Sequence, residues 1–133
     1  MIIIYAYVCG DILHEGHLLA LENAKAMGDK LIVGVLTDNA IMEKKPAPVV
    51  PFTERIQLVR SLKCVDCAVP QENYSPLNNI INIKPDILME SVSHKGNNYL
   101  EDLGKVFKGR IVMMPYYPEQ SSTAIKNKIR EMK

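Results

Sequence analysis

The sequence predicts an α/β fold in which helices cover both faces of a five-stranded parallel sheet. Apolar runs suited to strands alternate with segments of helical periodicity along the whole 133-residue chain. Several runs are apolar throughout, which is typical of strands covered on both faces. The intervals between them are long enough for the right-handed helical crossovers that parallel strands require. The length fits a single domain over residues 1–133.

The chain begins with an unbroken apolar strand, predicted over residues 2–8. The helix predicted over residues 16–27 repeats Leu18, Leu21 and Ala24 at helical spacing, so one of its sides is apolar. This strand and helix form the first half of a strand–helix–strand unit.

A second apolar strand is predicted over residues 30–37, and three prolines predict a surface loop over residues 38–51. The helix after it, residues 52–63, carries Ile56 and Val59 on its apolar stripe. The remaining predicted elements are strands over residues 65–69, 86–90 and 110–114 and helices over residues 76–83, 99–107 and 122–132.

Composition and charge exclude some functions. The formal net charge is +1, which does not indicate a general nucleic-acid or membrane surface. The apolar amino-terminal run is too short to span a bilayer and lacks the basic flank and cleavage pattern of a signal peptide. We therefore expect a cytoplasmic protein with no nucleic-acid or membrane partner.

The three cysteines are Cys9, Cys64 and Cys67, and their odd number, without a secretion signal, argues against a disulfide scaffold. Cys64 and Cys67 form a CxxC pattern, which suits half of a zinc site or a redox pair. No second CxxC or HxxxH pattern completes a zinc site, so core packing is the favoured interpretation and no protein metal site is predicted.

The clearest functional pattern opens the first predicted helix as His14-Glu15-Gly16-His17. In an open parallel sheet, ligands bind beyond the carboxyl ends of the strands, and this segment follows the first strand. A helix start offers unpaired N–H groups and partial positive charge, and a glycine lets a ligand approach the backbone closely. The pattern predicts a phosphate site, with surface histidines or half of a metal site as the alternatives.

The pattern resembles the HxGH signature of the cytidylyltransferase-like nucleotidyltransferases. The resemblance extends over nearly the whole chain, and its further matches are Gly34–Asp38 at the end of the second strand, the basic pair Lys44 and Lys45, Glu54-Arg55 at a helix start, and Ser121-Ser122-Thr123 before the last helix. It implies a Rossmann-like domain that binds a nucleoside triphosphate with Mg²⁺, and an acceptor oxyanion that attacks the α-phosphorus as pyrophosphate leaves.

The resemblance also implies roles for individual residues. His14, His17 and Lys44 are the implied catalytic residues. The residues implied to bind nucleotide or phosphate are Cys9, Gly10, Asp11, Gly16, Lys45, Ser121, Ser122 and Thr123. The residues implied to bind the acceptor are Arg55, Lys63, His94 and Tyr116.

Each of these roles has a structural alternative. The serines and threonine could simply cap a helix, and the two lysines could be a solvated pair on a loop. Arg55 could pair with a carboxylate on its own helix, and His94 could be a plain loop residue. The role implied for Asp11 is to orient a histidine or the metal's water shell.

Departures from the family pattern affect the predicted substrate. The family's Gly-Thr-Phe-Asp is Val8–Asp11 here, its Gly-Asp-Asp-Trp is Ser91–His94, and Tyr116 replaces a phosphate-gripping arginine. A plain glycerol-3-phosphate enzyme is therefore not expected. Partial similarity to phosphonate-pathway members favours transfer of CMP from CTP to a small phosphonate or phosphate acceptor.

Two other functions remain open. One is an adenylyltransferase that uses ATP on a small phosphorylated acceptor, because HxGH does not select the base. The other is a nucleotide-binding domain without turnover. A homodimer is expected from the resemblance and because dimerisation covers the edge of so short a sheet.

Overall fold

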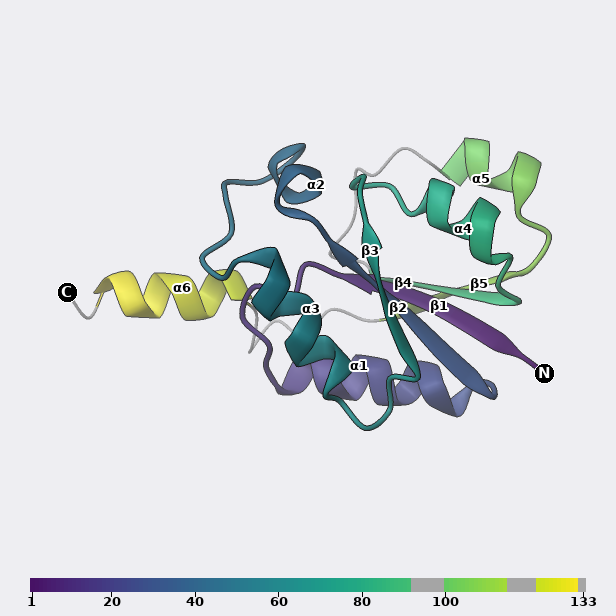
Figure 1. Ribbon diagram of the computed structural model, residues 1–133, viewed down its shortest axis with the longest axis horizontal. Coiled ribbons are helices and arrows are strands. Elements are labelled where there is room, and N and C mark those ends of the chain that lie inside the picture. The colour runs from purple at the N-terminus through teal and green to yellow at the C-terminus, as the bar shows by residue number, and fades with distance from the viewer. Residues whose placement is uncertain (92–99, 115–121, 132–133) are drawn as a thin grey trace.

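The computed structural model describes residues 1–91, 100–114 and 122–131. Five strands form one all-parallel sheet, as predicted, and their order in the sheet is β3-β2-β1-β4-β5 (Figure 1). The strands are β1 (Ile3–Val8), β2 (Lys30–Leu36), β3 (Cys67–Gln71), β4 (Ile87–Ser91) and β5 (Arg110–Met114). The chain crosses over between strands through helices, which confirms the α/β class.

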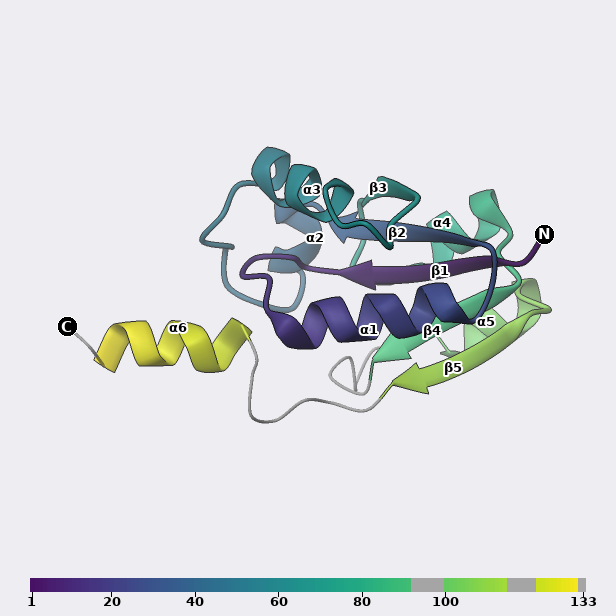
Figure 2. The ribbon, with the colours of Figure 1, turned by 90° about the horizontal axis from the view of Figure 1, so that it is seen from below.

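The helices are α1 (Glu15–Ala26), α2 (Asp38–Met42), α3 (Phe52–Arg60), α4 (Leu77–Ile83), α5 (Leu100–Val106) and α6 (Ser122–Glu131). α1 and α3 cover one face of the sheet, and α2, α4 and α5 cover the other (Figure 2). α6 projects from the side where the strands end, well away from the amino terminus (Figures 1 and 2). None of the helices in the described ranges is long and apolar enough to cross a membrane.

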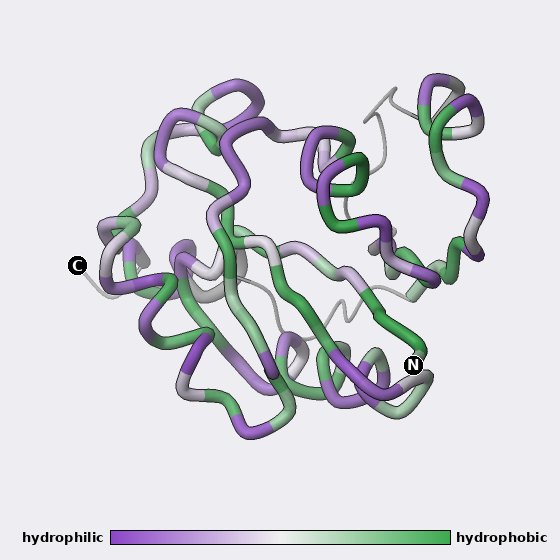
Figure 3. Tube along the Cα trace, turned by 45° about the vertical axis from the view of Figure 1, so that its right-hand side comes forward, coloured by the Kyte–Doolittle hydropathy of each residue, from purple (hydrophilic) through white to green (hydrophobic). Residues whose placement is uncertain are grey.

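Strand β1 supplies both hydrophobic cores. Ile4 and Ala6 face α1 and α3, whereas Tyr5 and Tyr7 face α2, α4 and α5. All four side chains are buried, which explains the continuous apolar run, because a strand covered on both faces needs no polar positions. The hydrophobic colour along the central strands shows the same arrangement (Figure 3).

The stretch predicted as a loop over residues 38–51 begins instead with a short helix, α2. The side chain of Thr37 caps this helix by accepting a hydrogen bond from the N–H of Ala40 at 3.2 Å, and Ala40 and Ile41 are buried. The third strand also lies two residues later than predicted and contains Pro70. Proline is compatible with β3 because this strand pairs only with β2, at the edge of the sheet.

The three cysteines are free and partly buried. Cys64 packs against the hydrophobic core between the sheet and helices α1 and α3. Cys67 packs against the core on the other face of the sheet, under α2, α4 and α5. Two thiols on opposite faces cannot share a metal ion or close into a disulfide without rearrangement. Core packing, the favoured interpretation of the CxxC pattern, is confirmed.

Candidate active site

The turn between β1 and α1 brings the first strand's carboxyl end next to a helix start. Gly10 is buried in this turn with a φ of 72°, a left-handed conformation that side chains other than glycine adopt at a cost. Gly16 is buried in the first turn of α1. The two glycines therefore belong to the segment that holds the histidines, as the motif predicts.

His14 and His17 hold each other in place around the start of α1. The N–H of Gly16 donates to Nδ1 of His14 at 3.0 Å, and the N–H of His14 donates to Nδ1 of His17 at 3.3 Å. The two ring centroids are 4.1 Å apart, with the ring planes inclined by 47°. This reciprocal cap gives both imidazoles one defined orientation.

Both rings are neutral hydrogen-bond donors near pH 7. Because each Nδ1 accepts a backbone N–H, the proton of each neutral imidazole resides on Nε2. Burial lowers the pKa of His14, and burial together with the charges of His14 and Lys45 lowers the pKa of His17 to about 4. The site thus presents two adjacent Nε2–H groups, which suit phosphate oxygens.

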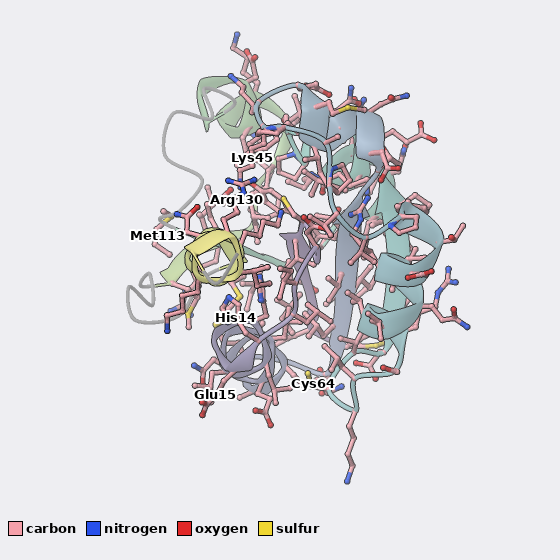
Figure 4. All side chains as sticks on the ribbon, turned by 90° about the vertical axis from the view of Figure 1, so that its left-hand side faces the viewer. His14, Glu15, Lys45, Cys64, Met113 and Arg130 are labelled. Atoms are coloured by element: carbon pink, nitrogen blue, oxygen red, sulfur yellow. The ribbon has the colours of Figure 1, made fainter. Side chains whose placement is uncertain are left out.

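Lys45 contributes positive charge next to the histidines. Its ammonium group influences the pKa of both His17 and Cys9, although the side chain is exposed. In the view onto the edge where the strands end, His14 and Lys45 lie on either side of α6 (Figure 4). Lys44 is also exposed, and among the described residues its side chain has no hydrogen bond or ion pair with either histidine. The structure therefore brings Lys45, more clearly than Lys44, to this site.

Asp11 anchors the loop that carries the lysines. Its carboxylate accepts the N–H groups of Val49 at 3.1 Å and Val50 at 2.8 Å, and it pairs with Lys126 of α6. Burial alone would raise the pKa of Asp11, but the hydrogen bonds from Lys126, Val50 and Val49 outweigh it and lower the pKa. In the described contacts Asp11 orients this loop and α6, and it does not contact a histidine.

Arg55, which was predicted to bind the acceptor, has a fully buried side chain whose described partners belong to the protein itself. The guanidinium donates to the carbonyl oxygens of Val50 at 2.9 Å, Cys9 at 2.5 Å and Leu36 at 2.6 Å, and it pairs with Asp38 at 2.6 Å. It therefore ties the ends of β1 and β2 to the loop between α2 and α3. The alternative of a carboxylate partner on its own helix is also wrong, since Asp38 belongs to α2.

The structure places Lys63 away from the histidines. Lys63 is exposed in the turn between α3 and β3, at the edge where the strands begin and opposite the site. Ser122 and Thr123 belong to the first turn of α6. His94, Tyr116 and Ser121 lie outside the described residues.

Sequence reasoning missed several polar groups near the carboxyl edge, the side of the sheet at which the parallel strands end. Lys126 reaches Asp11 from a distance of 115 residues along the chain. On the other face of the sheet, the hydroxyl of Tyr7 donates to Oε2 of Glu90 at 2.6 Å, and Tyr74 is buried close to Cys9 and Glu90. The one available signal was Glu90 itself, a charged residue at the end of an otherwise apolar strand.

A surface cavity of about 450 Å³ lies elsewhere, beside β3 and α4. Amide side chains dominate its lining, among them Gln71, Asn73 and Asn79, and neither histidine lines it. Much of this amide capacity is used internally, since Asn79 donates to Tyr5 and to the carbonyl of Pro70. The cavity is therefore distinct from the histidine pair.

Comparisons with known proteins agree with the geometry of the site. The family model described as cytidylyltransferase-like matches residues 9–128. The chain is 39% identical over 132 residues to the bifunctional protein HldE of Helicobacter pylori strain P12, in a match that covers 96% of this chain and 28% of that protein. The chain thus spans a little over a quarter of the length of this curated relative.

Two solved structures share the fold. A lipopolysaccharide core biosynthesis protein from Thermoplasma volcanium GSS1 is 29% identical with a TM-score of 0.79, over 88% of this chain and 98% of that one. A pantoate-beta-alanine ligase from Francisella tularensis, complexed with beta-gamma ATP and beta-alanine, is 19% identical with a TM-score of 0.58, over 98% of this chain and 70% of that one. The second match shows the fold alone.

The family match begins at Cys9, includes the capped histidine pair and continues into α6. On this combination of sequence and site, the chain belongs to the cytidylyltransferase-like family of nucleotidyltransferases.

Proposed function

We propose that the protein transfers a nucleoside monophosphate, CMP from CTP, to a small phosphate or phosphonate acceptor and releases pyrophosphate. The observation that carries this proposal is the pair of oriented Nε2–H groups on His14 and His17 at the start of α1. These donors, the helix N-terminus and Lys45 make one positively polarised surface at the carboxyl edge of the sheet.

The reaction requires an acceptor phosphate or phosphonate oxygen to attack the α-phosphorus in line. The bond between the α-phosphorus and the oxygen bridging to the β-phosphate breaks, and its electron pair leaves with pyrophosphate. Negative charge increases on the transferred group and the bridging oxygen during this step. The two Nε2–H donors and the Lys45 ammonium stabilise that charge, and their fixed orientation avoids reorganisation as the charge develops.

Mg²⁺ fits this site as a companion of the triphosphate. Across residues 1–91, 100–114 and 122–131, no group of three or more His, Cys, Asp or Glu side chains is arranged to hold a metal ion. The carboxylate of Asp11 already accepts two backbone N–H groups and the Lys126 ammonium. Phosphate oxygens and water are the usual Mg²⁺ ligands in such sites, so the ion would neutralise the phosphates that it accompanies.

The family description favours CTP as the donor. ATP is the second candidate, because the ligase from F. tularensis has this fold and was solved with an ATP compound. Similarity to a lipopolysaccharide core biosynthesis protein favours a phosphorylated sugar among the possible acceptors.

We place the reaction in the cytoplasm, where the three free thiols would remain reduced. The homodimer stays a prediction, which sedimentation analysis would test.

Pyrophosphate release measured with CTP and with ATP, across a panel of phosphates and phosphonates, tests the proposal. Release with ATP alone would overturn the choice of CTP, and release with neither would overturn nucleotidyl transfer. EDTA should abolish release, and excess Mg²⁺ should restore it.

The role of the histidines is tested by His17→Ala. Turnover should fall on the order of 10²–10³-fold, by analogy with the loss of one oxyanion donor. Glu22→Ala is the matched control, because Glu22 is exposed on the same helix and should be replaceable without effect. Unchanged turnover in His17→Ala would contradict the proposed mechanism.

A further inference from the structure

An ion pair at the carboxyl edge of the sheet ties helix α6 to the body of the protein. The helix begins on the side where the strands end and extends away from the sheet (Figures 1 and 2). Lys126, in its second turn, pairs with the carboxylate of Asp11, whose side chain is only 5% exposed. Among residues 126–130, Lys126 is partly buried and the other side chains are exposed, so Lys126 anchors this part of α6.

The same carboxylate also holds the loop that carries Lys45. Asp11 accepts the N–H groups of Val49 at 3.1 Å and Val50 at 2.8 Å, which lie at the far end of this loop. At the near end, Glu43 accepts a backbone N–H from the segment between β3 and α4 at 3.2 Å. Lys45 lies between these two attachment points. Asp11 therefore joins the loop of Lys45 and α6 to the turn that leads into the histidine pair.

The ion pair also balances a charge that would oppose a triphosphate. Asp11 is a buried anion at the edge where the proposed reaction binds phosphate, and like charges repel strongly where water is excluded. Lys126 is the cation beside it, so the pair is neutral overall. Loss of the ammonium would leave a buried negative charge without compensation. Lys126 thus affects both the position of α6 and the electrostatic potential at this edge.

Helix α6 lies between two of the groups that the proposed reaction places on the phosphates. In the view onto the carboxyl edge, His14 is on one side of α6 and Lys45 is on the other (Figure 4). Because an α-helix is stiff over one turn, an ion pair in the second turn of α6 also fixes its first turn. The position of α6 relative to the turn after β1 therefore affects the space for a triphosphate that contacts both groups.

We propose, on the basis of the proposed transfer reaction, that Lys126 is a positioning residue for the nucleoside triphosphate and acts through Asp11. The ion pair keeps α6 and the loop of Lys45 in the arrangement that binds the phosphates, and it cancels the charge of the Asp11 carboxylate. The histidine donors are held by their own cap. Lys126 therefore affects the affinity for the triphosphate more than the rate of the chemical step.

Calorimetric titration with CTP and with ATP, each with Mg²⁺ and without acceptor, measures this affinity directly. Lys126→Met should weaken binding of the preferred triphosphate about tenfold, as expected if the fraction of molecules in the binding arrangement falls tenfold. In initial rates of pyrophosphate release, KM for the triphosphate should rise by a similar factor, while kcat changes by less than about threefold. Lys126→Arg can still pair with the carboxylate and should bind within about threefold of the wild type.

Lys128→Met is the matched control, because Lys128 is exposed on the same helix and its loss changes the net charge equally. It should leave the affinity within about twofold of the wild type, as an exposed charge usually does. An effect as large as that of Lys126→Met would show that only the overall positive charge of α6 matters, and the proposal would be wrong.

A double-mutant cycle separates action through Asp11 from direct contact with the phosphates. Asp11→Asn removes the charge that Lys126 pairs with, so in that background Lys126→Met should change the affinity by less than about twofold. Independent losses that multiply in the double variant would mean that Lys126 acts without Asp11, which contradicts a positioning role. If Asp11→Asn fails to fold, Lys126→Arg decides: binding as weak as in Lys126→Met would overturn the proposal.

Failure of this proposal and failure of the transfer reaction give different results. Pyrophosphate release with unchanged triphosphate affinity in Lys126→Met would overturn the role of Lys126 and leave the transfer reaction standing. Triphosphate binding that depends on Lys126 through Asp11, without pyrophosphate release for any acceptor, would support that role and contradict the transfer reaction. A wild-type protein that binds neither triphosphate would overturn both.

Discussion

His17 shows how a local cap prepares a residue for chemistry. Its Nδ1 accepts the backbone N–H of His14, and its ring is partly buried, so the neutral form is favoured in the folded protein. An imidazolium there would have to give up this hydrogen bond and lie next to Lys45. His17 is therefore a neutral hydrogen-bond donor near pH 7.

This pKa shift predicts a dependence of stability on pH. The pKa of His17 is about 4 in the folded protein and close to its ordinary value of 6.5 in the unfolded chain. Between these values the unfolded chain binds more protons, so the free energy of unfolding falls as pH decreases from about 6.5 towards 4. We expect His17 to contribute a loss of about 2 kcal/mol across this window.

Urea unfolding at pH 7, 6 and 5 checks this prediction, with His17→Gln as the comparison. The variant should lose less stability on acidification than the wild type. The lowered pKa of Asp11 does not interfere, since its contribution is lost only as pH falls below about 3.8. Parallel curves for the two proteins would contradict the shift.

At the scale of elements, Arg55 of α3 joins segments that the chain brings together from far apart. Its guanidinium donates hydrogen bonds to carbonyl groups at the ends of β1 and β2 and in the loop before α3. Its Cζ atom lies over the Phe52 ring, 5.6 Å from the ring centroid. The carboxyl edge of the sheet, where the histidine pair lies, therefore depends on a fully buried residue.

Arg55→Met should lower the free energy of unfolding by about 3 kcal/mol or more, because it leaves Asp38 and two strand-end carbonyl groups without their donor. Arg60→Met is the matched control on the same helix, where the side chain is exposed and makes one long hydrogen bond of 3.5 Å. Thermal and urea unfolding measure the difference. An equal effect of the two substitutions would show that the buried contacts of Arg55 are not important for stability.

At the scale of the whole molecule, the sheet tolerates a polar network in its centre because one position has no side chain. A Cβ on Gly34 of β2 would lie 1.9 Å from the hydroxyl of Tyr5 and 2.8 Å from Oε1 of Gln71. Tyr5 donates to that same oxygen at 2.5 Å and accepts from Asn79 at 2.9 Å. Gly34 thus allows β1, β3 and α4 to share one buried hydrogen-bond network.

Gly34→Ala should destabilise the protein by about 2–3 kcal/mol, as an overpacked core does. Gly104→Ala is the control, because nothing lies within 4 Å of a Cβ there and alanine favours the helix by up to about 1 kcal/mol. Differential scanning calorimetry of both variants makes the comparison. A neutral Gly34→Ala would mean that Tyr5 moves aside without loss, and that the network is not needed for the fold.

The fold and the histidine pair were predictable from the sequence because both depend on local order along the chain. Apolar runs of strand length alternate with helical periodicity, and this alternation leaves few topologies other than a parallel sheet covered on both faces. His14 and His17 are one helical turn apart, so any helix that begins there places both rings at its start. Only α2 was missed among the elements, because its single turn has too few residues to show a period.

The tertiary structure alone decided which charged side chains are buried and which partners they meet. Arg55 was predicted to bind the acceptor and is buried, while Lys126, which no sequence pattern singled out, pairs with Asp11 at the carboxyl edge. Their partners are far away in the sequence: Arg55 and Asp38 are 17 positions apart, Tyr7 and Glu90 are 83 apart, and Asp11 and Lys126 are 115 apart. Periodicity determines which side of an element a residue lies on, but only the packing of one element against another determines which charges meet.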